Sequence, residues 1–215
     1  REVAIIGCGP INFEVTRFLR AVWPSITSFY AFDVDVGRAE QFKQKWKRLS
    51  VDVEVITDLS TVLRAAKLIS IATSATTPHI FSISECVPGG TLLHVSLRDL
   101  SPEAILSGDN VVDDVAHVCR AQTSIHLAEQ LTGSREFIRC TLAEILEGTA
   151  AAKKDSQAVT VFSPFGLGVL DLAVAQLVVE LASARKCGTL LENFLPASSS
   201  TDYTDYTEKS ASTAD

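Results

Sequence analysis

Short apolar runs separated by amphipathic segments recur along the chain. The first run, Val3–Ile6, is followed by Gly7-Cys8-Gly9 and then by apolar residues at helical spacing. Runs this short fit strands buried on both faces, and a spacing of about 3.6 residues fits helices. Further apolar runs lie at 28–33, 51–55, 68–73, 91–96, 110–112 and 158–162. This alternation predicts an α/β fold with a Rossmann-type doubly wound, mostly parallel sheet.

The segments between these runs predict the helices. In the first helix one face carries Ile11, Val15, Phe18, Leu19 and Val22, and we expect this face to pack on the sheet. Three polar residues are expected to be N-caps: Asp35 for a helix from about Gly37 to Lys47, Asp58 for a helix through Ala66, and Ser101 for a helix that opens with Pro102. The stretch from 115 to about 146 is predicted to be mostly helical.

A long helix is predicted from Val169 to about Arg185. It is apolar on nearly every face, with Val, Leu and Ala at most positions and a stop at Gly188. A helix that is apolar all round is expected to be buried all round. We therefore divide the chain into a NAD-binding Rossmann domain (1–158), a C-terminal strand and helix (159–196) and a disordered polar tail (197–215).

The turn after the first strand has the chemistry of a dinucleotide-binding loop. Gly7 permits the tight turn and Gly9 lets the backbone approach a pyrophosphate, while Pro10 and Ile11 begin the helix whose N-terminus attracts anions. The third motif position, usually Gly or Ala, is Asn12. We expect Asn12 either to loosen the packing of helix on strand or to offer its amide to the phosphate.

An acid follows at the distance that such a fold requires. Asp33 ends the second predicted strand, 21 residues after Asn12, where a carboxylate bonds the ribose 2′-hydroxyl of NAD. A 2′-phosphate about 4 Å from Asp33 would be repelled by up to ~4 kcal/mol at an effective dielectric near 20, which favours NAD over NADP. Arg38 is the nearby residue that would soften this repulsion. The alternative is that Asp33 merely caps a helix.

Hydroxyl residues end the strand at 68–73. Thr73 and Ser74 begin the run Thr73–Pro78, and the carboxyl end of a strand where the sheet order reverses is where a cofactor crevice forms. We therefore assign Thr73 and Ser74 to the cofactor site. Ordinary turn chemistry is an equally good explanation for any single hydroxyl in this run.

Composition narrows the function classes. The 215 residues carry a net charge of −7, which offers no electrostatic footprint for nucleic acid or for an anionic membrane. Five cysteines without a C-x-x-C pair indicate reduced thiols in the cytoplasm. His117 and His126 lie nine residues apart, the wrong spacing for a metal site on one helix face, so no metal is expected. The absence of Met and the start beside a strand suggest an internal piece of a longer product.

Four segments together resemble the ornithine cyclodeaminase/mu-crystallin family, and within it the dehydrogenases that form 2,3-diaminopropionate. These segments are Gly7–Glu14, His94–Leu100, Val112–Asp114, and Phe162–Gly168 with Asp171. The resemblance implies NAD-dependent oxidation of N-(2-amino-2-carboxyethyl)-glutamate to 2-oxoglutarate and 2,3-diaminopropionate, a precursor for siderophores or peptide antibiotics. Ornithine cyclodeaminase, ketimine reductase and alanine dehydrogenase activities remain alternatives, as does a non-catalytic NAD-binding module.

The resemblance also assigns roles to single residues. Asp99 matches the catalytic aspartate, with a turn acid or partner of Arg98 as the alternative. Ser163 and Asp171 match positions near the nicotinamide, although Asp171 could simply face solvent, and Ser96 is grouped with the cofactor site. In the family a substrate-binding domain precedes this region, so we expect the amino-acid substrate site and a homodimer interface to lie in that domain, which this chain lacks.

Overall fold

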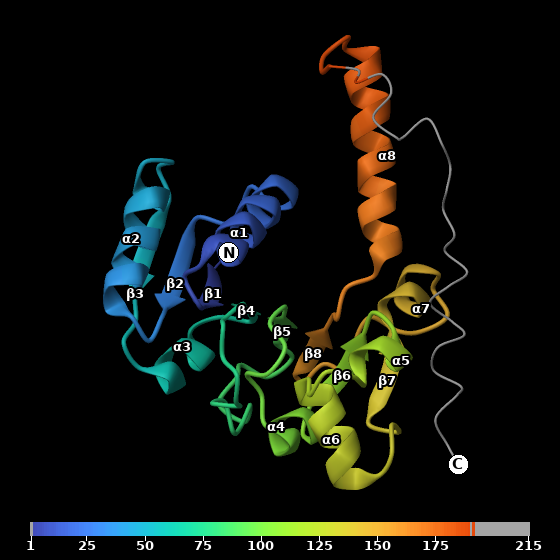
Figure 1. The fold of residues 1–215 in the computed structure, drawn as a ribbon. Helices are drawn as coiled ribbons and strands as arrows, with labels where there is room; N and C mark the ends of the chain where they lie inside the picture. Colours follow the sequence, from blue (N-terminus) through green and yellow to red (C-terminus); the bar gives the residue numbers. More distant parts are fainter. Residues whose placement is uncertain (1, 190, 192–215) are drawn as a thin grey trace, which may run out of the picture. The chain divides into compact units, whose positions relative to one another are not determined.

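The computed structural model describes residues 2–189 and 191, and it divides into two units, Arg1–Leu167 and Gly168–Asp215. Among the described residues of the first unit, eight strands form one sheet in which every pairing is parallel (Figure 1). The strands are β1 (Glu2–Ile6), β2 (Ser28–Phe32), β3 (Asp52–Val55), β4 (Leu68–Ile71), β5 (Thr91–His94), β6 (Asp109–Val112), β7 (Ile138–Thr141) and β8 (Thr160–Ser163). Their order is β3-β2-β1-β4-β5-β8-β6-β7, which confirms the predicted α/β fold with a parallel sheet.

Helices connect these strands. They are α1 (Pro10–Val22), α2 (Val36–Lys47), α3 (Leu59–Ala65), α4 (Pro102–Leu106), α5 (Val115–Val118), α6 (Ser124–Thr132) and α7 (Leu142–Leu146). The three predicted N-caps are confirmed, because the side chains of Asp35, Asp58 and Ser101 accept the backbone N–H groups of Arg38, Thr61 and Ala104. Asp33 is therefore not the cap of α2.

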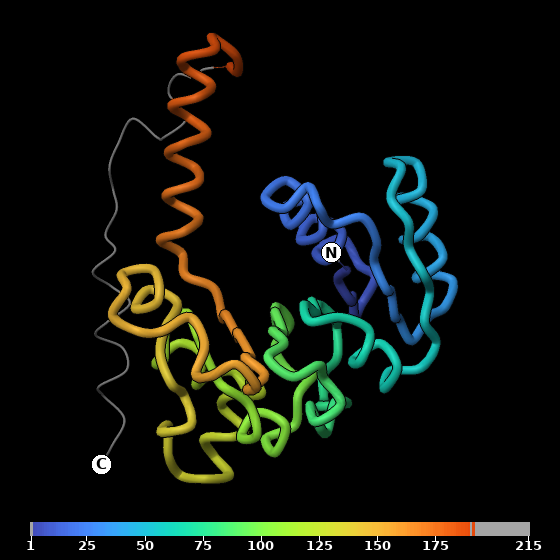
Figure 2. The backbone as a smooth tube through the Cα atoms, turned by 180° about the vertical axis from the view of Figure 1, so that it is seen from behind, coloured from blue at the N-terminus to red at the C-terminus, as the bar shows by residue number. Residues whose placement is uncertain are grey.

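The sheet is covered on both faces. Along β1, Val3 and Ile5 pack into one apolar cluster and Ala4 and Ile6 into another. The first cluster joins α1 and α2 to β1–β3, with Trp46 at its centre and its ring centroid 5.3 Å from that of Phe13. These two helices lie side by side in both views of the backbone (Figure 2). The second cluster includes residues of α3, α4 and α6.

The predicted inward face of α1 is wrong. Its buried residues are Asn12 and Thr16, whereas Ile11, Phe18 and Val22 are 60%, 71% and 68% exposed. The polar pair can lie inside because each side chain has hydrogen-bond partners there; Thr16 Oγ1, for example, donates to Asn12 O at 2.9 Å. The spacing of the apolar residues thus predicted the helix correctly but not which face of it is buried.

Two further predictions need correction. The stretch 115–146 contains β7, an edge strand that pairs with β6 and that a mostly helical assignment missed. The boundary at 158/159 is also wrong, since β8 lies between β5 and β6 and belongs to the first unit, which extends to Leu167. The predicted disordered tail, 197–215, lies outside the described residues.

The second unit contains α8 (Gly168–Ala184). Its composition predicted burial on every side, but none of its residues is buried. Leu172, Val174 and Val179, for example, are 72%, 60% and 64% exposed. Among the described residues, none of the helices is both long enough and apolar enough to cross a membrane.

Candidate cofactor-binding site

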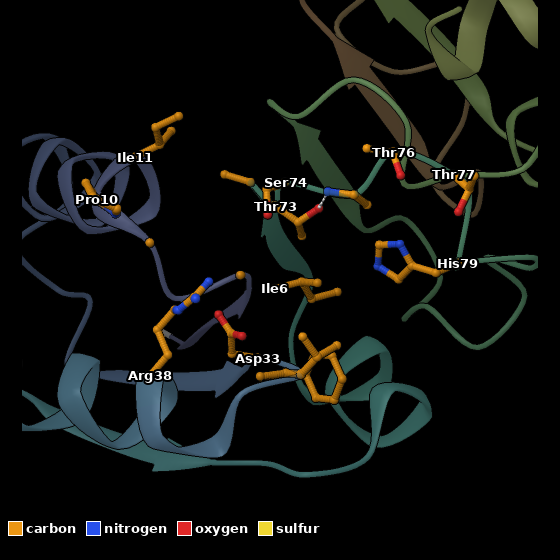
Figure 3. Close-up of a pocket in the computed structure, with 16 residues that line it drawn as sticks. Ile6, Pro10, Ile11, Asp33, Arg38, Thr73, Ser74, Thr76, Thr77 and His79 are labelled. Atoms are coloured by element: carbon orange, nitrogen blue, oxygen red, sulfur yellow. Dashed lines mark hydrogen bonds between the residues drawn. The ribbon is translucent and has the colours of Figure 1, made fainter.

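A cavity of about 590 Å³ opens at the carboxyl ends of β1, β2 and β4 (Figure 3). The strand order reverses between β1 and β4, which is where open α/β sheets form ligand crevices. The lining comes from three segments: the glycine turn with the start of α1, the end of β2 with Arg38, and the run after β4. Its polar or glycine members are Gly7, Gly9, Asp33, Arg38, Thr73, Ser74, Thr76, Thr77 and His79.

The physical reason for a glycine differs between Gly7 and Gly9. Gly7 has φ +88°, and a Cβ there would lie 2.3 Å from Ala72 O, so the backbones of the turn and of β4 touch. A Cβ at Gly9 would meet no protein atom within 4 Å. Because Gly9 also lines the cavity, the space beside it is open to a ligand.

The N-terminus of α1 faces this open space. Gly9 is its N-cap, no side chain caps it, and Pro10 occupies the first helical position (Figure 3). Uncapped N–H groups and the positive end of a helix dipole together attract phosphate. Gly9, Pro10 and Ile11 therefore lie where the sequence predicted a pyrophosphate site.

Asn12 does not offer its amide to the cavity. Its side chain is fully buried, and Nδ2 donates to Ile6 O at 2.9 Å and to Gly7 O at 2.7 Å. Its Oδ1 accepts a 2.6 Å hydrogen bond from Ser70 Oγ on β4. The predicted amide contact with a phosphate is therefore wrong for this side chain, which instead fastens the turn to α1 and β4.

Asp33 lines the cavity beside the glycine turn and is 8% exposed. Its Oδ2 accepts the Cys8 N–H at 2.8 Å and its Oδ1 accepts the Asp35 N–H at 3.0 Å. A carboxylate has about four acceptor sites, so Asp33 keeps capacity for a ligand hydroxyl. Burial and, after it, the charge of Asp33 raise the pKa of the Cys8 thiol to about 12, although the charge of Arg38 acts to lower it. A thiol with that pKa is protonated at neutral pH and therefore unreactive.

The far wall of the cavity comes from the run after β4. Thr73, Ser74, Thr76, Thr77 and His79 all line it, and the first four belong to the hydroxyl run that the sequence analysis assigned to a crevice. The hydroxyl of Thr73 turns away from the cavity, however, since it donates to Asp99 Oδ1 and accepts the Ala75 N–H at 3.0 Å (Figure 3).

Asp99 is the centre of a buried polar network behind this wall. It is 0% exposed and accepts hydrogen bonds from Thr73 and Ser96, the latter at 2.5 Å, and its Oδ2 lies 3.3 Å from His94 Nε2. The other ring nitrogen of His94 lies 3.1 Å from Ser163 Oγ. Burial raises the pKa of Asp99, but hydrogen bonds from His94, Ser96 and Thr73 outweigh it and hold that pKa below its usual value. Asp99 is therefore ionised at neutral pH.

Besides Asn12, four predicted site residues do not line the cavity. Asp99, Ser96 and Ser163 belong to the hydrogen-bonded network behind the wall. Asp171 lies in the first turn of α8, in the second unit, and is exposed. Among the described residues, no cluster of three His, Cys, Asp or Glu side chains forms a metal site.

His79 is the lining residue that the sequence reasoning missed. It follows Pro78, where the predicted hydroxyl run ends, and its ring lies at the cavity wall 3.9 Å from Asp99 Oδ1 (Figure 3). The signal was available, since a titratable residue next to a predicted crevice is a candidate for catalysis.

The comparisons with known proteins agree with this geometry. A model of the ornithine cyclodeaminase/mu-crystallin family matches residues 1–186. The chain is 20% identical over 195 residues to the N-((2S)-2-amino-2-carboxyethyl)-L-glutamate dehydrogenase of Staphylococcus aureus, which covers 89% of this chain and 58% of that protein.

Two solved structures have the same fold. The Δ(1)-pyrroline-2-carboxylate reductase of Thermococcus litoralis, in complex with NADH and L-proline, has a TM-score of 0.82 at 21% identity, covering 89% of this chain and 61% of that one. An archaeal alanine dehydrogenase dimer with bound NAD has a TM-score of 0.79 at 22% identity, covering 90% and 61%. The chain thus spans less than two thirds of the length of these relatives.

Proposed function

Because this chain belongs to the ornithine cyclodeaminase/mu-crystallin family, we propose that it is the NAD-binding part of an amino-acid dehydrogenase. The observation that carries the proposal is the cavity in which an open glycine turn and the uncapped N-terminus of α1 face the carboxylate of Asp33. The glycine turn and the helix N-terminus are the features that bind a phosphate, and the carboxylate is the feature that binds a ribose diol.

From one end of the cavity to the other, the lining residues suit the successive parts of NAD. Gly9, Pro10 and Ile11 would hold the pyrophosphate, and Asp33 would accept the hydrogen bonds of the adenosine ribose. The run Thr73–His79 would then flank the nicotinamide, whose chemistry is the acceptance or donation of a hydride. Asp33 also favours NAD over NADP, because a 2′-phosphate would meet its negative charge, with Arg38 as the nearest compensation.

For the reaction, we propose oxidation of N-(2-amino-2-carboxyethyl)-glutamate. A hydride leaves the glutamate α-carbon for NAD⁺ and a proton leaves the nitrogen; one water then adds to the resulting C=N bond, and the C–N bond breaks to leave a ketone and an amine. The products are 2-oxoglutarate, 2,3-diaminopropionate, NADH and one proton. The support is the similarity to the Staphylococcus aureus dehydrogenase over 89% of this chain, together with the segment His94–Leu100.

A second candidate is reduction of a cyclic imine. The Thermococcus litoralis reductase, solved with NADH and L-proline, has a TM-score of 0.82 with this chain, which supports keeping this class open. Both reactions exchange a hydride at a carbon bonded to nitrogen, so the cofactor site would serve either.

The test has two arms. NADH fluorescence with the 215-residue chain measures cofactor binding, and we expect saturable enhancement. The naturally produced protein is then assayed with NAD⁺ and N-(2-amino-2-carboxyethyl)-glutamate, L-proline or L-alanine, with turnover expected for the first. Turnover of L-proline alone would favour the second candidate, and NADH binding without any turnover would favour a regulatory module.

We also propose that the protein works as a homodimer on a small amino-acid substrate. The support is the dimer of the archaeal alanine dehydrogenase and the exposed apolar surface of α8, since apolar patches of this kind commonly mark interaction sites. Sedimentation of the naturally produced protein at micromolar concentration checks this, and a stable monomer would contradict it.

A further inference from the structure

We propose that His79 is the catalytic base of the reaction, the group that accepts the proton from the substrate nitrogen. This inference rests on the proposed dehydrogenase function and assigns a role to a side chain in the cavity wall. Among the cavity-lining residues of the described chain, the titratable ones are Asp33, Arg38 and His79. The first two lie together at the ribose end, and the His79 ring lies across the cavity from them (Figure 3).

The backbone holds His79 in place. The N–H groups of His79 and of Ile80 both donate to Asp99 O at 2.9 Å, which clamps this segment to the loop after β5. The side chain remains 32% exposed and faces the cavity. A rigid backbone with an accessible ring is what a base that meets a substrate requires.

Asp99 supplies the electrostatic reason for this role. Its Oδ1 lies 3.9 Å from His79 Nε2, and no Arg or Lys among the described residues pairs with this buried carboxylate. The groups that face it are His79, His94, Thr73 and Ser96. A base acquires a positive charge as it takes up a proton, and a negative charge beside it attracts that positive charge.

His94 cannot take this role itself. It is 1% exposed, and its two ring nitrogens lie within hydrogen-bond distance of Ser163 and Asp99. His94 and Asp99 are therefore positioning residues, whereas His79 is the member of the group that a substrate can touch.

The proton step balances with the proposed oxidation. The substrate enters as a secondary ammonium ion, and its N–H bond breaks as the proton moves to the imidazole of His79. The freed nitrogen lone pair then forms the C=N bond while the α-hydrogen leaves with its electron pair to NAD⁺. His79 afterwards releases that proton to solvent, which is the one proton that the overall reaction produces.

The experiment uses the naturally produced protein with saturating NAD⁺. We expect His79→Gln to lower kcat about 10²-fold, the usual scale of a lost acid–base group, while NADH affinity measured by calorimetry changes less than about threefold. The matched control is His117→Gln, since His117 is exposed on α5 and outside the cavity lining. That variant is expected to keep kcat within about twofold.

Added imidazole separates a chemical role from a structural one. It should raise kcat of His79→Ala at least tenfold, because a free base can enter the space the ring leaves, and it should not rescue Asp99→Asn. An unchanged kcat in His79→Gln, or no rescue of His79→Ala, overturns the role of His79. If the unaltered protein binds no NADH, the proposed function itself fails.

Discussion

The two ends of the cavity are built in different ways. At the proposed ribose and pyrophosphate end, backbone geometry dominates. The turn at Gly7 lies so close to Ala72 O that there is no space for a Cβ, and Asp33 accepts two backbone N–H groups within one βαβ unit. Behind the other end, Thr73 and Ser96, from the loops after β4 and β5, donate to the buried carboxylate of Asp99, and His94 at the end of β5 lies between Asp99 and Ser163 at the end of β8. The first end depends on local sequence and the second on long-range assembly.

This difference matches the chemistry expected at each end. A pyrophosphate is the same in every dinucleotide, so a fixed backbone turn can bind it. A reacting substrate needs groups that accept and release protons, and those are side chains whose environment must be tuned. We therefore expect substitutions at the first end to act on folding and cofactor affinity, and those at the second to act on turnover and pH response.

The largest effect is expected at the glycine turn. Gly7→Ala should lower the free energy of unfolding by about 3 kcal/mol or more, because a Cβ would overlap Ala72 O and φ is +88°. Gly9→Ala is the matched control, since φ is −82° and its Cβ would meet open space. It should change stability by less than about 1 kcal/mol but weaken NADH binding at least tenfold.

Urea unfolding and NADH titration of both variants check this pair. Equal losses of stability in the two variants would contradict the difference that we infer between the glycines. Unchanged NADH affinity in Gly9→Ala would mean that the open space beside Gly9 is not where the cofactor lies.

A somewhat smaller loss of stability is expected when Asn12 is replaced. Asn12→Ala removes the donor to Ile6 O and Gly7 O and the acceptor of Ser70 Oγ, all of them buried. Leaving such groups unpaired costs about 1–3 kcal/mol, which urea unfolding would detect. Thr132→Ala is a control on an exposed helix residue whose hydroxyl donates to Ala128 O, for which about 1 kcal/mol or less is expected. A stability loss at Asn12 no larger than at Thr132 would contradict the fastening role.

The smallest effect concerns pH and tests the other end of the cavity. The pKa of Asp99 is lowered in the folded protein, so its ionised form contributes stability above the unfolded value near 3.9. That contribution is lost as the pH falls through the lower folded value. The difference in unfolding free energy between the unaltered chain and Asp99→Asn should therefore be constant from pH 7 to 5 and shrink below about pH 4. A difference that stays constant down to pH 3 would contradict an ionised Asp99.

Much of the first end could be predicted from the sequence because its determinants are close together. Gly7, Gly9 and Asp33 follow a strand–turn–helix–strand spacing that local rules capture. The spacing did not reveal that Asn12 turns inward, because that depends on Ser70 on a strand 58 residues further along. The exposed face of α1 was misjudged for the same reason: burial follows what packs against a helix.

The second end could be predicted only in part. The sequence placed Thr73, Asp99 and Ser163 at the carboxyl ends of strands or just after them, and the structure brings all three to one network. Which of these residues faces the cavity depends on loop geometry that no local pattern encodes, so His79 was missed. The strand β7 was missed because Ile138–Thr141 is short and partly polar, with Arg139 held by Asp109 at 2.5 Å.

The central claim is that the cavity binds NAD and that Asp33 selects it over NADP. Calorimetric titration of the 215-residue chain with NADH and with NADPH, in the same buffer, tests it directly. We predict that NADH binds at least tenfold more tightly than NADPH, which is a difference of about 1.4 kcal/mol in binding free energy. Asp33→Asn is expected to reduce this ratio of the two affinities. Equal or tighter binding of NADPH, or binding of neither cofactor, would contradict the account.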